Sequence, residues 1–104
     1  MHELGDLRSG CASTAGHWDP EGILNDPHNA QKGILPAGDL QEAVADKNGD
    51  ARIEQSTGRL TLFGPESIVG RALVIHKNPD AAPMPNPRIA CCTIGLASAP
   101  KKAY

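Results

Sequence analysis

The chain has 104 residues, enough for one domain of modest size, with a formal net charge of -2 and a sequence pI near 6.0. This charge, without a block of Lys and Arg, argues against nucleic acid or an anionic membrane as a partner. No apolar run approaches the ~20 residues that span a bilayer, and the first residues do not resemble a signal peptide. Leu, Ile, Val and Phe make up only about a fifth of the chain, so the core is thin. Small domains of this kind commonly use a disulfide or a metal for the missing stability.

Residues 1–38 are predicted to form a long loop. Gly, Pro, Asn and Asp recur there every few residues, as in Gly16-His17-Trp18-Asp19-Pro20. A structureless run of this length in a compact domain is normally functional or disordered. Short strands are then expected at 40–46 and 51–56, because Asn48-Gly49 between them favours a hairpin turn.

The second half of the chain contains the strongest strand patterns, at 68–76 and 88–96. Residues 77–87 between them are rich in proline and predict a loop, and residues 97–104 predict a frayed tail. The sequence shows no internal repeat and no convincing helix. It therefore predicts a single all-β domain, whose open strand edges favour association with another chain.

Four histidines and three cysteines are the candidates for chemistry. His2, His17, His28 and His76 all lie in predicted loops or at a strand end, and imidazole suits copper and zinc. Their spacing alone does not separate metal ligands from solvated surface groups. The odd number of cysteines suggests one bridge and one leftover thiol.

The pairing of the cysteines is open at this level. Neighbouring residues of a strand point to opposite faces, so either Cys91 or Cys92 can meet Cys11, but not both. A bridge from Cys11 to Cys91 would close a loop for which the chain-entropy model gives about 4.5 kcal/mol. The third possibility is three free thiols.

A series of short motifs extends over nearly the whole chain. They are His2-Glu3-Leu4-Gly5-Asp6, Gly10-Cys11, Gly16-His17-Trp18-Asp19-Pro20, Gly38-Asp39-Leu40, Ala45-Asp46-Lys47-Asn48-Gly49, Gly64-Pro65, the run from Gly70 to His76, and Arg88-Ile89-Ala90-Cys91 with Ile94-Gly95. In order and approximate spacing they resemble the C-terminal two-thirds of the copper/zinc superoxide dismutases. The resemblance implies one partial domain over residues 1–104, an all-β Greek-key barrel of the superoxide dismutase type with its N-terminal strands missing.

The resemblance also implies a set of site residues. His2, His17 and His76 match copper ligands, and His17 matches the histidine that bridges copper and zinc and takes up a proton when copper is reduced. The implied zinc ligands are His17, His28 and Asp39. Arg88 matches the arginine that guides the superoxide anion, and Cys11 and Cys91 match the family's disulfide, which favours Cys91 over Cys92. Asp80 is in position to orient a ligand imidazole.

Several positions depart from the family pattern. The first histidine of the copper pair would lie before Met1, and Pro36 stands where a third zinc histidine is expected, so zinc is doubtful. The loop after His76 is short, and Pro85-Asn86-Pro87 replaces a glycine-rich lead-in to Arg88. These features resemble the copper-only branch of the family. With three copper ligands in a partial barrel, we expect the isolated chain to bind copper weakly and to show little activity.

The function implied by the resemblance is the copper-dependent conversion of superoxide to oxygen and hydrogen peroxide. The alternatives are a catalytically impaired structural or metal-binding protein, or the dismutase-like domain of a copper chaperone. The implied partners are the superoxide anion, a second copy in a homodimer and a copper chaperone. The expected dimer contacts are Gly5, Val69, Gly70, Ile94 and Leu96. A cytoplasmic and an extracellular location both agree with the sequence.

Overall fold

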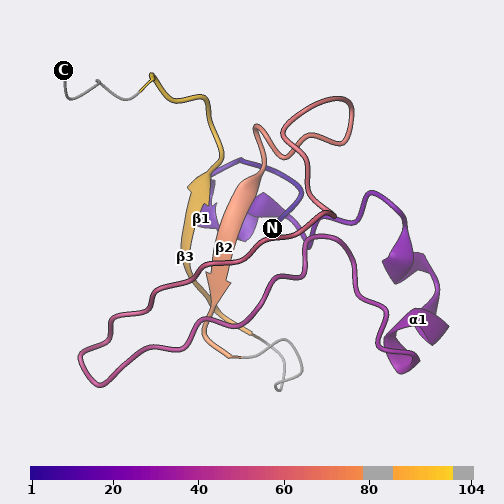
Figure 1. The fold of residues 1–104 in the computed structure, drawn as a ribbon, viewed down its shortest axis with the longest axis horizontal. Coiled ribbons are helices and arrows are strands. Elements are labelled where there is room, and N and C mark those ends of the chain that lie inside the picture. The colour runs from indigo at the N-terminus through magenta and orange to yellow at the C-terminus, as the bar shows by residue number, and fades with distance from the viewer. Residues whose placement is uncertain (79–85, 100–104) are drawn as a thin grey trace.

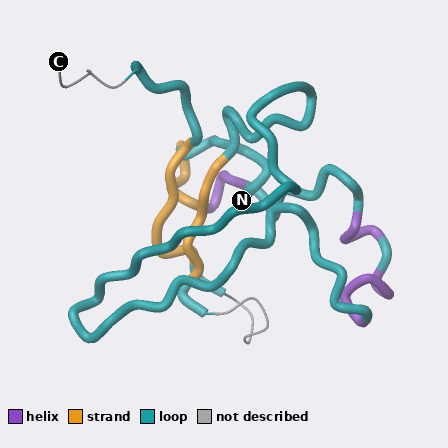
Figure 2. The backbone as a smooth tube through the Cα atoms, in the orientation of Figure 1, coloured by secondary structure: helices purple, strands orange, loops and turns teal. Residues whose placement is uncertain are grey.

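Loops and turns make up most of the chain in the computed structural model, which describes residues 1–78 and 86–99 (Figures 1 and 2). The elements, in chain order, are strand β1 (Arg8–Cys11), the 3-10 turns Ala12–Thr14 and Ile23–Asn25, helix α1 (Pro27–Gln31), and strands β2 (Ala72–His76) and β3 (Arg88–Thr93). Within these described ranges, the one sheet consists of β2 and β3, and no closed barrel is formed. The all-β character is confirmed at the level of strands and loops, and the Greek-key barrel stays a prediction.

Strands β2 and β3 lie inside the two strongest predicted strands and pair antiparallel. Ala72 and Val74 are buried while their neighbours in β2 are partly exposed, which is the alternation of a strand with one covered face. The register places Val74 opposite Cys91 and, after an irregularity, His76 opposite Arg88. This pairing brings two predicted site residues to the same end of the sheet.

The prediction of strands at 40–46 and 51–56 is wrong. Residues 41–59 are all exposed and have no strand structure, and they form a long two-armed excursion from the body of the molecule (Figure 1). The Asn48-Gly49 turn does form, because the Asp46 carboxylate accepts hydrogen bonds from the backbone N–H of Asn48 and Asp50. The arms lack a neighbouring strand to complete a hydrogen-bond ladder, so the turn forms without a hairpin.

The predicted loop over 1–38 contains more structure than expected. It includes β1 and the five-residue helix α1, which the sequence analysis did not identify. Helix α1 starts with a clear local signal: Asp26 is the N-cap and its carboxylate accepts from the backbone N–H of His28, with Pro27 at the first helical position.

The small core lies where three distant segments meet. Its buried apolar residues are Met1, Ala37, Ala72 and Val74. The Cα radius of gyration of 15.2 Å exceeds the about 13 Å typical of a compact domain of this length. The thin core predicted from composition is confirmed.

Part of the predicted loop 77–87 and of the tail 97–104, and with it Asp80, lies outside the described residues. Among the residues that are described, no helix is long and apolar enough to cross a membrane.

Candidate metal centre

Three of the four histidines meet at one point. Within the described part of the chain, His2, His17 and His76 form the one group of three or more potential ligand residues whose donor atoms all lie within 4.8 Å of one another. The ring centroids are 5.0 Å apart for His2 and His17, 5.2 Å for His2 and His76, and 5.6 Å for His17 and His76. The prediction that these three imidazoles come together is therefore confirmed as geometry.

A cycle of backbone hydrogen bonds positions this site. The Trp18 N–H donates to the Met1 carbonyl at 2.8 Å, the Gly38 N–H donates to the Trp18 carbonyl at 2.8 Å, and the Met1 nitrogen donates to the Gly38 carbonyl at 2.7 Å. His2, His17 and Asp39 are each the immediate neighbour of one member of this cycle. Three loop segments that are far apart in sequence thus deliver their polar side chains to one place.

Only glycine fits at the third position of the cycle. A Cβ at Gly38 would lie 2.4 Å from the Met1 carbonyl oxygen and 2.6 Å from the Trp18 nitrogen, which are both backbone atoms that cannot move aside. His2 is tied to the sheet as well, because its N–H donates to the Ala72 carbonyl at 2.7 Å. The site is therefore anchored to both the loop cycle and β2.

The Nδ1 atom of each of the three imidazoles faces an oxygen atom. His2 Nδ1 donates to the Ala15 carbonyl at 2.8 Å, and His76 Nδ1 lies 3.3 Å from the Asn86 carbonyl. His17 Nδ1 contacts a carboxylate oxygen of Asp39. Carbonyl oxygens only accept, so in the neutral imidazoles of His2 and His76 the proton sits on Nδ1 and the lone pair on Nε2.

The Nε2 atoms of His2 and His76 face each other and need a proton or a metal ion between them. The Nε2 atoms of His2 and His76 are 3.0 Å apart, and each carries a lone pair when Nδ1 is protonated. Two such acceptors repel each other unless a proton or a metal ion lies between them. Three imidazoles are a donor set that transition metals such as copper take readily, so the residues present fit a metal ion of this kind.

Burial keeps the imidazole of His2 in its neutral form. The pKa of His2 is lowered from 6.5 to about 4, mainly because burial disfavours the charged ring; the hydrogen bond to the Ala15 carbonyl opposes this shift, and the nearby charge of Arg88 adds to it. His2 is almost fully buried, with a relative exposure of 2%. The ring is thus neutral at physiological pH, which is the state that binds a metal.

Arg88 lies beside the histidines and is held by backbone. Its Nη1 donates to the Cys11 carbonyl at 2.9 Å and lies 3.1 Å from the Thr14 hydroxyl. Cys11 is bonded to Cys91 with a Cα–Cα distance of 5.7 Å, so the predicted disulfide is confirmed, and Cys92 is the exposed free thiol.

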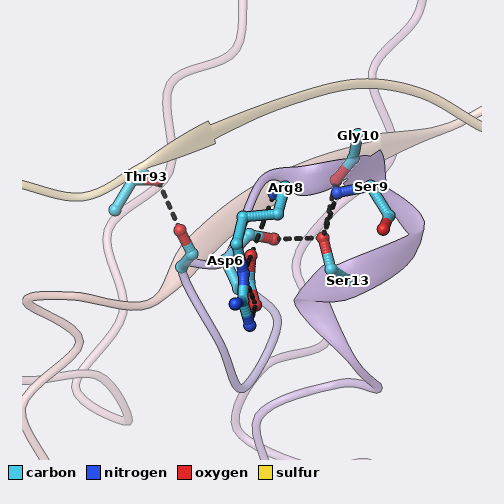
Figure 3. A network of polar contacts seen from close by, with 7 residues as sticks. Asp6, Arg8, Ser9, Gly10, Ser13 and Thr93 are labelled. Carbon is cyan, nitrogen blue, oxygen red and sulfur yellow. Dashed lines mark hydrogen bonds and ion pairs between the residues drawn. The ribbon is translucent and has the colours of Figure 1, made fainter.

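The segment that carries Cys11 has its own polar network (Figure 3). Arg8 donates to the Asp6 carboxylate from its backbone N–H at 2.9 Å and from its guanidinium at 2.8 to 3.1 Å, and the Ser13 hydroxyl donates to the Asp6 carbonyl at 2.8 Å. The Thr93 hydroxyl donates to the Gly5 carbonyl at 2.8 Å, which ties this loop to the end of β3. Arg8 also lowers the pKa of Asp6 to about 2.

The predicted zinc ligands do not come together. His17 and Asp39 contact each other, but His28 lies on α1, with its Nδ1 3.0 Å from Asp26 and with 70% of the side chain exposed. The physical reason is the cap of α1, in which Asp26 binds both the backbone and the ring of His28. Pro36 is fully buried and offers no donor. The described residues therefore do not fit a zinc ion beside His17.

Three of the predicted dimer residues lie in one patch. The Gly70 N–H donates to the Ile94 carbonyl at 2.8 Å, and a Cβ on Gly5 would lie 2.2 Å from the Gly70 carbonyl oxygen. Val69 and Leu96 are exposed, at 37% and 92%. This arrangement is compatible with the predicted interface and does not test it.

Some residues of the site were not identified from the sequence. Thr14, which is buried between His2 and Arg88, and the carbonyls of Ala15 and Asn86 hold the histidines and the arginine. Backbone carbonyls leave no side-chain signal. Gly38 could have been identified from the sequence, since it belongs to the Gly38-Asp39-Leu40 motif.

Comparison with known proteins defines the class. The model of the copper/zinc superoxide dismutase family matches residues 1–94, so the chain belongs to this family. Among solved structures it is similar to the clock protein EA4, with 35% sequence identity and a TM-score of 0.73; the match covers 92% of this chain and 67% of that one.

Proposed function

We propose that this chain carries the copper site of a superoxide dismutase, in which His2, His17 and His76 hold copper. The observation that carries the proposal is the convergence of three imidazoles with two facing acceptor nitrogens 3.0 Å apart. When bound, copper would supply one-electron chemistry that oxidises one superoxide to oxygen and reduces the next to hydrogen peroxide. Membership of the family supports this assignment.

Arg88 attracts and orients the anion in this proposal. Its Nη1 donates to Cys11 and Thr14, and its Nε and Nη2 groups bond to none of the described residues. These N–H groups form a fixed fork that can receive an anion beside the histidines.

Asp39 fixes the position of the proton on the His17 ring. Asp39 accepts at His17 Nδ1, which orients the ring and fixes a proton on this nitrogen, so that the other nitrogen is left for copper. In this proposal Asp39 replaces zinc as the group that positions His17. It is a positioning residue, and His17 and Arg88 are the catalytic residues.

The fold proposal is a single partial domain of the family's Greek-key barrel. The exposed arms at 41–59 and the open edge of β2 are features that further strands would cover. With three ligands, copper is expected to be held loosely in the isolated chain. A homodimer through the patch of Gly5, Gly70 and Ile94, and copper delivery by a chaperone, complete the proposal.

The test is the dependence of superoxide decay on Arg88. Excess protein with limiting copper should consume superoxide slowly, and Arg88→Gln should lower the rate by about tenfold without changing copper affinity. Arg88→Lys should restore part of the rate, and added salt should lower the rate of the parent chain more than that of Arg88→Gln. Copper released into solution would give a rate that is the same for all three proteins, and that result would refute the proposal.

A second candidate is a role other than dismutation for the same fold. The similar structure is described as a clock protein, and the zinc ligands of this chain are not assembled. Copper binding without any dependence of superoxide decay on Arg88 would favour this candidate.

A further inference from the structure

The histidines and Arg88 line a cavity that is much larger than a two-atom anion. This cavity has a volume of about 560 Å³, and its polar lining includes the three histidines, Asn86 and Arg88. Sites of roughly 300–1,000 Å³ with a few convergent polar groups normally take small organic molecules.

Part of the cavity lining is apolar. We call Ile23, Leu24, Ile34 and Leu35 the apolar wall; all four line the cavity. Leu24, Ile34 and Leu35 are 60%, 42% and 49% exposed, which is a high exposure for a cluster of aliphatic side chains. The wall therefore leaves hydrophobic surface uncovered next to the metal centre.

The wall is held in place by hydrogen bonds. The Asn29 side chain donates to the Ile23 carbonyl at 2.9 Å, and the Asn29 carbonyl accepts from the Ile34 N–H at 2.8 Å, so one residue links the two halves of the wall. The Asp19 carboxylate accepts from the Ile23 and Leu24 N–H groups, both at 2.8 Å. These bonds fix the wall before any ligand arrives, which lowers the cost of binding.

A guanidinium that bonds to no carboxylate is available to an anionic head group. Two carboxylates also line the cavity, where Asp26 contacts the ring of His28 and Asp39 contacts the ring of His17. Arg88 bonds only to neutral oxygens of Cys11, Ala12 and Thr14 among the described residues, so its positive charge is not neutralised by a carboxylate there.

We propose that this cavity binds a medium-chain organic carboxylate, with its head group on the Nε and Nη2 groups of Arg88 and its hydrocarbon chain against the apolar wall. The proposal goes beyond dismutation and does not require copper. The carboxylate matches the guanidinium fork, and the chain covers aliphatic surface that superoxide would leave exposed to water.

The test is titration of the complete, metal-free chain with octanoate and with acetate, followed by backbone amide NMR. The two ligands share a head group and differ in the chain. Octanoate, below its micelle concentration, should bind at least about tenfold more tightly than acetate, with shifts at residues 23–24, 34–35 and 88. Equal affinities, or shifts elsewhere, would overturn the proposal.

Matched variants separate the wall from general hydrophobic binding. Leu24→Ser and Leu35→Ser should reduce octanoate affinity about fivefold each and leave acetate unchanged, and their exposure makes misfolding no concern. Leu62→Ser, whose parent side chain is 55% exposed outside the cavity, should have no effect. If Leu24→Ser instead abolishes a dimer and leaves octanoate binding intact, a second copy covers the wall and the proposal fails. If the copper-loaded parent chain shows no superoxide decay that depends on Arg88 while octanoate still binds the metal-free chain, the proposed function fails and the carboxylate proposal stands.

Discussion

Cys11 is joined to Arg88 in two ways: its carbonyl accepts a hydrogen bond from Arg88 Nη1 at 2.9 Å, and its sulfur is bonded to Cys91, three residues beyond Arg88 in β3. The disulfide thus fixes the carbonyl that holds the guanidinium. The position of the Arg88 guanidinium therefore depends on a covalent bond between a loop and the strand that carries the arginine.

Cys91→Ser should therefore affect both stability and anion binding. The chain-entropy model gives a loss of about 4.5 kcal/mol in unfolding free energy for a bridge that spans 80 residues of sequence. Azide affinity of the copper-loaded protein should also fall severalfold, because Arg88 loses a fixed anchor. Thermal unfolding and azide titration measure the two effects.

The neighbouring cysteine is the control. Cys92→Ser removes an exposed free thiol, so it should change neither the unfolding temperature nor azide affinity. If both variants behave alike, the role assigned to the disulfide is wrong.

Asp39→Asn should weaken copper binding. Asp39 accepts from His17 Nδ1, and loss of such a carboxylate typically costs 10- to 100-fold in metal affinity. Competition with a chelator gives the affinity. Asp26→Asn is the matched control, because Asp26 makes the same contact with the exposed His28 and should leave copper affinity unchanged. Equal losses in both variants would show that only net charge matters.

Gly38→Ala should disrupt the backbone cycle that brings His2, His17 and Asp39 together. The added Cβ would meet backbone atoms at 2.4 and 2.6 Å, so we expect a loss of about 1–3 kcal/mol in stability together with a loss of copper affinity. Gly58→Ala meets no atom within 4 Å and should be neutral. Denaturant unfolding and copper titration of the two variants check this, and a neutral Gly38→Ala would show that the cycle does not position the site.

The metal-free protein should become less stable as the pH falls from 6.5 to 4. The folded pKa of His2 is about 4, below the usual 6.5, so the unfolded chain binds more protons in this window. The contribution of His2 is fully present above pH 6.5 and amounts to about 3 kcal/mol. Urea unfolding across the window should show this slope in the parent chain and a smaller one in His2→Gln. Asp6, with a pKa of about 2, titrates below the window. An identical slope in both proteins would contradict the assignment to His2.

Leu96→Asp should disrupt the proposed homodimer, because Leu96 is 92% exposed and follows Ile94 of the patch by two residues. Phe63→Asp places the same charge at a side chain that is 82% exposed elsewhere and should leave the dimer intact. Sedimentation velocity distinguishes the two, and a parent chain that is already monomeric at high concentration would exclude the proposed homodimer.

The sequence predicted the parts of the fold that local pattern and family motifs determine. Strands β2 and β3 lie within 68–76 and 88–96: alternate apolar residues of β2 are buried, and β3 completes its hydrogen-bond ladder. The segments at 40–46 and 51–56 have similar strand propensity, but a strand needs a neighbour for its backbone hydrogen bonds, and propensity does not supply one. Helix α1 was missed although Asp26-Pro27 is a standard start signal.

The candidate site shows the same division. His2, His17 and His76 could be named from motifs because ligand side chains are specific. His28 was also named as a zinc ligand from the resemblance, but its ring and backbone are held by Asp26 in the local cap of α1, away from His17. The carbonyls of Ala15, Asn86 and Cys11 could not be predicted, since every residue has a carbonyl and only the three-dimensional path of the chain selects these three.

The central claim is that His2, His17 and His76 together hold copper. Electron paramagnetic resonance of the chain loaded with one equivalent of Cu(II) tests it most directly, through hyperfine coupling to the ligand nitrogens. We predict three equatorial nitrogens in the parent chain and in His28→Gln, and two in His2→Gln, His17→Gln and His76→Gln. A spectrum that changes with His28→Gln and stays the same when His76 or His2 is replaced would contradict the account.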